Sequence, residues 1–375
     1  VTIIASMINI YQIPFVSTMI AHEKMSQYAT IGIIDVVLRF SAALVLLYVT
    51  ADKLKIYAFL ILFVAIANFL LYSMYSKRHF QETRFKMSKE KQLYKKMLCF
   101  SGWNIFSAIS IAANGQIVNV LLNIFFGPAV NAARGISMQA SGAVSGFVGN
   151  FQIAVNPQIT KLYAEEKLDK FYLLIKRSAK FSFFLLLVFA LPIIIRIDEV
   201  LGVWLVEVPE YAPIFCQIIL ITSLINTFSL PLATAANATG NIKKFQLSTG
   251  IVELMNIPIS YILLRWGLPA YSVFLVSTCI TIITLIIRLT VLRSLINLDI
   301  LNFVSSVIVR SFAIAIVTSI IAFGLDKLFS DSSLLTTIIF ILSSIATTVL
   351  VVFAWGLKKD ERQFLKSIIY SKLKR

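Results

Sequence analysis

Apolar runs of about 20 residues recur from one end of the chain to the other, separated by short polar segments. Each run is about long enough to cross roughly 30 Å of hydrocarbon as a helix. Backbone polar groups cannot stay unpaired in lipid, and the period-two alternation of barrel strands is absent, so the runs predict helices. Eleven membrane spans are expected, at about 1–21, 28–50, 55–75, 98–126, 132–157, 179–196, 211–235, 245–264, 270–289, 303–324 and 334–356.

Two of these regions read as copies of one hairpin. Residues 9–14 (NIYQIP) and 32–35 (GIID) reappear as residues 226–231 (NTFSLP) and 250–253 (GIVE), at offsets of 217 and 218. In each copy a proline interrupts an apolar helix, and an acid follows about two turns into the next one. Apolar segments also resemble one another by chance, but the shared order favours a duplication, which is typical of transporters.

The repeat predicts the architecture of the whole protein. Three spans precede the second copy, and the same number is expected before Val1, so the chain reads as an N-terminally truncated fragment. The complete fold is then six helices, six more in the same orientation, and two extra helices. The predicted segments are half of a first lobe (1–76), a basic inter-lobe loop (77–97), a six-helix lobe (98–297), two extra helices (298–357) and a basic tail (358–375).

Composition and charge add the class of protein and its orientation. The chain is 58% hydrophobic and 14% charged, with a mean hydropathy of +0.86, which excludes a soluble globular protein. Of the 34 Lys and Arg residues, 26 fall on one side of the predicted topology and 6 on the other. The positive-inside bias places the first set, including the C-terminus, in the cytoplasm. The net charge of +16 is thus a topology signal, and nucleic acid explains it poorly.

Two residue types have mainly structural interpretations. The odd number of cysteines lies in or beside apolar spans and indicates buried packing residues, with no metal spacing or disulfide framework: Cys99, Cys216 and Cys279. Three prolines are expected to interrupt helices, as kinks or as exposed carbonyls for a ligand: Pro14, Pro231 and Pro258.

The span at 98–126 carries three amides on one helix face. Gln116, Asn119 and Asn123 are spaced i, i+3 and i+7. Bonding to a neighbouring helix explains one such residue, whereas a stripe of three favours the wall of a water-filled cavity.

The next span, 132–157, combines a charge with small residues. Arg134 lies near the start of the helix, where it either snorkels to the headgroups or faces inward. Facing inward, it offers a fork of donors suited to phosphate oxygens. The glycines of residues 142–149 predict close packing against a neighbouring backbone.

Three further charged residues lie inside apolar spans. Asp35 and Arg39 are four residues apart, so they can pair on one helix face. Glu253 has no basic residue at i±3 or i±4, so it needs a partner on another helix, contact with water, or a proton. A structural hydrogen bond and an ion or proton site both remain open for it, and these three residues are the candidates for ion coupling.

Seven short motifs are distributed over essentially the whole chain. The most specific is NAARGI at 131–136, followed by Gln139, and the others are IAHEKM (20–25), FSGWN (100–104), NFQ (150–152), NPQITK (156–161), WL (204–205) and VPEY (208–211). These motifs resemble those of the Wzx-like polysaccharide flippases, in the superfamily that also holds multidrug extruders and the lipid II flippase.

The resemblance implies a bacterial inner-membrane protein that flips a polyprenyl-diphosphate-linked oligosaccharide for O-antigen, capsule or exopolysaccharide synthesis. Arg134 then holds the diphosphate, and the substrate crosses the membrane by alternating access. No catalysis is expected. The amides expected beside the sugar or headgroup are Asn104, Gln116, Asn119, Asn123 and Gln139. The resemblance also implies a polysaccharide polymerase and a chain-length regulator as partners. With no nucleotide-binding loop or metal spacing, the expected energy source is H⁺, Na⁺ or the membrane potential.

Two rival functions remain open. A multidrug cation extruder of the same fold would favour acids over arginine in its cavity. A membrane enzyme of the same pathway, such as a polymerase or ligase, typically needs a catalytic outer loop. Here the predicted outer loops are short, and the two histidines, His22 and His79, fall on the cytoplasmic side.

Overall fold

The computed structural model describes the whole chain except residues 49–51, 84–89, 330–332, 358–360 and 363–375. Every regular element in this described part is helical, as the apolar runs predict. The α-helices are α1 (Thr2–Ala21), α2 (Met25–Tyr48), α3 (Lys53–His79), α4 (Lys91–Phe126), α5 (Pro128–Ala164), α6 (Leu168–Ile195), α7 (Ile197–Trp204), α8 (Ala212–Asn226), α9 (Ser229–Ala238), α10 (Lys243–Arg265), α11 (Ser272–Ile296), α12 (Ile300–Phe303), α13 (Arg310–Leu328) and α14 (Leu334–Val351).

Ten helical segments of the described chain are long and apolar enough to cross a membrane. Large apolar side chains are exposed along them, such as Ile3, Leu47 and Phe63, as expected of surfaces that face lipid. A multi-pass helical membrane protein is therefore the fold class. The predicted span at 132–157 lies within α5, which is not among the ten because glycine, serine and amide residues interrupt its apolar sequence.

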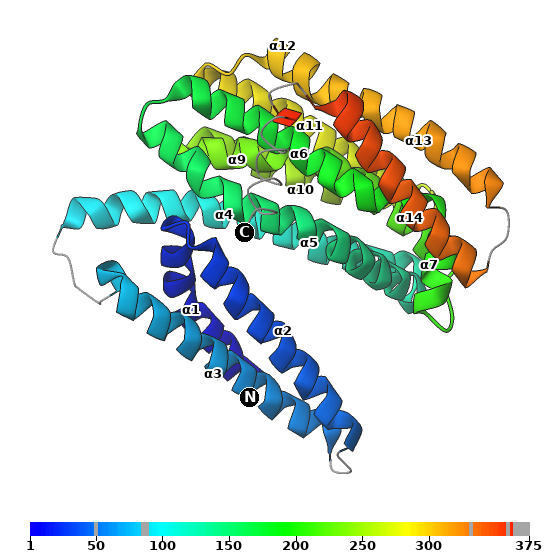
Figure 1. Cartoon of the computed structure of the whole chain (residues 1–375), viewed down its shortest axis with the longest axis horizontal. Coiled ribbons are helices and arrows are strands. Elements are labelled where there is room, and N and C mark those ends of the chain that lie inside the picture. Colours follow the sequence, from blue (N-terminus) through cyan, green and yellow to red (C-terminus); the bar gives the residue numbers. More distant parts are fainter. Residues whose placement is uncertain (49–51, 84–89, 330–332, 358–360, 363–375) are drawn as a thin grey trace. The chain divides into compact units, whose positions relative to one another are not determined.

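The chain forms two compact units, Val1–Lys91 and Gln92–Arg375. In the first, α1 and α2 each pack on α3 (Figure 1). Their common core contains Met19 and Tyr72, and Phe80 stacks on the ring of His22 at 4.3 Å between centroids.

In the second unit the most buried membrane helix is α6. It packs against α5, α8, α9, α13 and α14 (Figure 1). Phe183 of α6 stacks on Phe228 at 4.9 Å, in the larger of the two apolar clusters of this unit. Because α6 is surrounded on most sides, few of its residues reach the lipid-facing surface.

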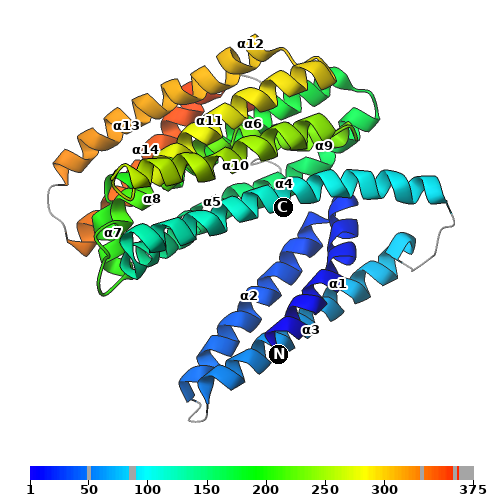
Figure 2. The ribbon, with the colours of Figure 1, turned by 180° about the vertical axis from the view of Figure 1, so that it is seen from behind.

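The remaining helices of this unit build a more polar side. There α10 packs along α11, and α4 is joined to α10 by side-chain hydrogen bonds (Figure 2). Gly250 of α10 makes a close approach to α4, since a Cβ there would lie 2.7 Å from the Phe106 ring. The acid of the second predicted repeat, Glu253, lies one turn further along this contact.

Two sequence-based expectations on local structure hold only in part. Pro14 and Pro258 lie inside continuous helices, whereas near Pro231 the helix is broken between α8 and α9. A cyclic side chain removes one backbone donor, and lipid-embedded helices tolerate this loss when neighbouring groups compensate. Only Cys216 of the cysteines is buried, while Cys99 and Cys279 are exposed.

The glycines of residues 142–149 do not mediate close packing among the described residues. A Cβ built at Gly142, Gly146 or Gly149 meets no atom within 4 Å. Of the predicted basic tail, only Glu361 and Arg362 lie within the described residues. There the Glu361 carboxylate accepts hydrogen bonds of 2.7 and 2.5 Å from the buried Lys180 ammonium of α6.

Candidate functional site

A tight helical hairpin positions Arg134. A single residue, Gly127, separates α4 from α5, and its φ of +83° is one that glycine adopts without strain. Pro128 follows at the first position of α5, where its fixed φ suits a helix start and its missing N–H costs nothing. Because the chain reverses within one residue, Arg134 lies opposite Asn119, at nearly equal distance from the turn along the other helix.

The Arg134 guanidinium crosses the hairpin to α4. Nη1 donates to Oδ1 of Asn119 and Nη2 to the carbonyl of Gly115, each at 2.9 Å. Its Nε is buried and has no hydrogen-bond partner among the described residues. The side chain thus points between the helices rather than towards headgroups, and it keeps one donor unused.

An amide network connects α4, α10 and α11. Asn256 Nδ2 donates to Oδ1 of Asn114 at 2.9 Å and to Oγ of Ser277 at 3.0 Å. Ser260 donates to Oδ1 of Asn256 at 3.0 Å, and Asn114 donates to Oε2 of Glu253 at 3.5 Å. The bonds from Ser260 through Asn256 and Asn114 lead to Glu253, and this part of the network polarises in favour of negative charge on its carboxylate.

The partner that Glu253 lacks on its own helix is Arg288 of α11. The two side chains interact electrostatically, without a direct ion pair within the described part of the chain. The Arg288 guanidinium lies 5.8 Å from the ring centre of Phe245, and its Nε is buried with no hydrogen-bond partner among the residues described. The predicted span at 270–289 ends just after Arg288, whereas α11 continues to Ile296.

These groups share one cavity of about 420 Å³ within the second unit. Its charged residues in the described chain are two arginines and one carboxylate, so it carries an excess of positive charge. The polar side chains that line it come from five helices: Asn114, Arg134, Thr222, Ser223, Asn226, Glu253, Asn256, Ser277, Thr281 and Arg288. Such a cavity suits an oxygen-rich anion, because forked guanidinium donors and amides match its acceptors.

Other predicted binding residues lie outside this cavity. Asn104 accepts a 2.7 Å hydrogen bond from Nε2 of Gln246, which joins α4 to α10 nearer the start of both helices. Gln116, Asn123 and Gln139 are exposed and do not line the cavity. Of the three amides predicted as one stripe, Asn119 is therefore the one that meets Arg134.

The ion pair predicted between Asp35 and Arg39 is present in the first unit. Arg39 Nε lies 2.9 Å from both carboxylate oxygens of Asp35, and Asn68 of α3 donates a further bond of 2.5 Å to the same carboxylate. The pairing was predictable because it is local to one helix, whereas the Asn68 contact depends on how α3 packs against α2.

A pattern in the sequence indicates the cavity residues of α10 and α11, which the candidate residues above do not include in full. On α11, Ser277, Thr281, Thr284 and Arg288 are spaced i, i+4, i+7 and i+11, so they form one polar face in an otherwise apolar helix. A similar face on α10 contains Glu253 with Asn256 and Ser260. Searching for polar faces across every span, rather than for charges near loops, would have found Arg288.

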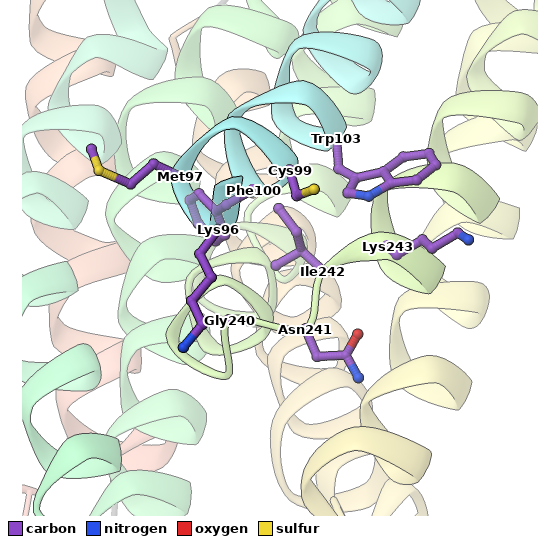
Figure 3. Close-up of a pocket in the computed structure, with 9 residues that line it drawn as sticks. All are labelled: Lys96, Met97, Cys99, Phe100, Trp103, Gly240, Asn241, Ile242 and Lys243. Atoms are coloured by element: carbon purple, nitrogen blue, oxygen red, sulfur yellow. The ribbon is translucent and has the colours of Figure 1, made fainter. Parts of the chain in front are cut away.

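A second cavity, of about 530 Å³, lies at the basic ends of α4 and α10 (Figure 3). Lys243 lies 5.4 Å from the ring centre of Trp103, and Figure 3 shows Lys96 beside Gly240 and Asn241. A third cavity, of about 560 Å³, is mostly apolar and is bounded by α5, α6 and α14. Lysine and tryptophan at helix ends are typical of the membrane interface.

Comparison of the chain with protein-family models, with curated proteins and with solved structures gives no match.

Proposed function

We propose that this protein flips a polyprenyl-diphosphate-linked oligosaccharide from the cytoplasmic to the periplasmic leaflet of the bacterial inner membrane, for the synthesis of a cell-surface polysaccharide. The observation that carries the proposal is the arginine- and amide-lined cavity inside a bundle of membrane helices. Moving an unpaired diphosphate through hydrocarbon would cost tens of kcal/mol, on the order of the Born energy of buried ions. Arg134, positioned by Asn119, replaces part of the lost hydration while the lipid tail stays in the bilayer.

In this proposal the chain belongs to a fourteen-helix fold of two six-helix lobes and two extra helices, with a cytoplasmic C-terminus. Alternating access results from rocking of the lobes. The energy comes from H⁺, Na⁺ or the membrane potential. Asp35, Arg39 and Glu253 are the groups that couple this energy source to transport. A polysaccharide polymerase and a chain-length regulator act on the delivered repeat unit.

The test is export in cells that depend on the full-length protein. Arg134→Ala should reduce surface polysaccharide by more than tenfold, and lipid-linked repeat units should accumulate in the cytoplasmic leaflet, because one charged contact to phosphate is worth a tenfold effect or more. Arg134→Lys should restore little, since lysine lacks the fork. Arg310→Ala is the matched control, because Arg310 bonds the Trp355 carbonyl outside the cavity.

Full export by Arg134→Ala at wild-type protein level would overturn the proposal. Efflux of lipophilic cations that requires Glu253 would instead favour the multidrug extruder. The charge of the cavity argues against that outcome, since two arginines face one carboxylate.

A further inference from the structure

Arg288 is a half-buried cation that the proposed function does not use. Its Nε has no hydrogen-bond partner in the described chain, and the side chain lines the same cavity as Arg134. An unpaired donor on a charged guanidinium costs more than an unpaired neutral donor, so Arg288 is poorly satisfied as it stands. The same holds for the Nε of Arg134. Two arginines, each with an unused donor, therefore line one polar cavity.

Glu253 balances only one of the two positive charges. It interacts with Arg288 through charge, and its hydrogen bond from Asn114 is long, at 3.5 Å. A carboxylate held this loosely can separate from Arg288 without breaking a short bond. The remaining positive charge has no counterion among the described residues that line the cavity.

We propose that Arg288 and Arg134 together form an oxyanion site, in which Glu253 is a resident counterion that the arriving phosphate displaces from Arg288. The cavity of about 420 Å³ has room for a phosphate group with part of its hydration, since each water occupies about 30 Å³. The proposal rests on the proposed function only for the natural anion, the diphosphate of the lipid-linked substrate. It adds Arg288 as a binding residue and Glu253 as the group that tunes affinity.

A displaced counterion has a specific consequence for binding. Glu253 competes with the ligand, so neutralising it strengthens binding, whereas neutralising Arg288 weakens it. A structural ion pair behaves differently, because removing either member harms the fold and removing both restores balance. The double variant therefore separates the two interpretations.

The experiment measures pyrophosphate binding by calorimetry, using the full-length protein in nanodiscs of the zwitterionic lipid phosphatidylcholine at fixed ionic strength. We expect Arg288→Gln to weaken binding by about tenfold or more and Glu253→Gln to tighten it by about tenfold, the effect of one charged contact. The double variant should bind as weakly as Arg288→Gln. Arg310→Gln, which removes an arginine outside the cavity, should bind as wild type does.

Three results would overturn the inference: wild-type affinity in Arg288→Gln, weaker binding in Glu253→Gln, or recovery of wild-type affinity in the double variant. Absence of pyrophosphate binding beyond the effect of chloride at equal ionic strength would overturn it as well. Should Arg288→Gln fail to fold, Arg288→Lys tests the same point, because it keeps the charge but loses the planar fork.

Export in cells tests the proposed function separately from the binding experiment. Expected pyrophosphate binding together with full export by Arg134→Ala leaves the anion site standing and makes the proposed substrate wrong. Lost export by Arg134→Ala together with unchanged pyrophosphate affinity in Arg288→Gln rejects only the role of Arg288.

Discussion

Asn256 of α10 and Asn114 of α4 are joined by a 2.9 Å hydrogen bond and are 142 positions apart in the chain. Gln246 and Asn104 join the same two helices at 2.7 Å with the same separation. The two hydrogen bonds lie ten residues apart along each helix, and their partners have the same sequence separation. This requires that α4 and α10 run parallel and in register. Amide side chains thus hold the two helices together over about 15 Å, at 1.5 Å per residue.

This amide contact predicts a stability effect. Asn256→Ala removes the donor to Asn114 and Ser277, and should lower the unfolding free energy by about 0.6 to 1.7 kcal/mol, the range for hydrogen bonds between membrane helices. Thermal unfolding in detergent measures it. Asn123→Ala is the matched control, since that amide is exposed. Equal effects of the two substitutions would show that the α4–α10 contact does not depend on Asn256.

Gly250 predicts a steric effect. A methyl group there would lie 2.7 Å from the Phe106 ring and 3.1 Å from Oγ of Ser110, so Gly250→Ala forces these side chains of α4 to shift. The expected destabilisation is about 1–3 kcal/mol, as for an overpacked core. At Gly142 the space is open, and Gly142→Ala should be neutral or stabilising by up to about 1 kcal/mol through helix propensity. Thermal unfolding of both variants checks the contrast, and an unchanged midpoint for Gly250→Ala would contradict it.

Asn119 predicts a positioning effect on transport. Its Oδ1 accepts from Nη1 of Arg134, so Asn119→Ala frees the guanidinium to rotate while the charge stays in place. Export should fall by roughly tenfold, less than in Arg134→Ala, because only one hydrogen bond to a charged group is lost. Surface polysaccharide normalised to protein level is the readout, with Asn123→Ala as control. Export at the wild-type level in Asn119→Ala would show that Arg134 needs no support from α4.

The first unit offers a test of charge pairing. Asp35→Ala leaves the Arg39 guanidinium without its carboxylate, whereas Asp35→Ala with Arg39→Ala removes both charges. The double variant should therefore be more stable than the sum of the two single effects predicts, by about 0.5–3 kcal/mol. A double-mutant cycle on thermal unfolding measures this coupling energy. Simple additivity would mean that the pair contributes nothing to the fold.

The sequence predicted what depends on local pattern. The helical class follows from the length of the apolar runs, and the Asp35–Arg39 pair follows from their spacing of four residues. Arg134 was left between two orientations because its partners, Asn119 and Gly115, lie on the preceding helix beyond the Gly127 turn.

The contents of the cavity were harder to predict. Glu253 required a partner, but nothing in one helix indicates that α11 supplies Arg288. The glycines at 142–149 show the opposite error. Their spacing matches a packing motif, yet no neighbouring atom occupies the space beside them in the described chain.

The equal separation of the two amide pairs has a mechanical consequence. Sliding α4 past α10 by one helical turn would mismatch both pairs at once. These two helices should therefore move as one rigid unit during transport. Movement that opens the cavity then falls to its remaining walls, from α5, α8 and α9, because α11 packs along α10 and moves with it. Arg288 and Glu253 then travel together, and separating them requires only side-chain movement.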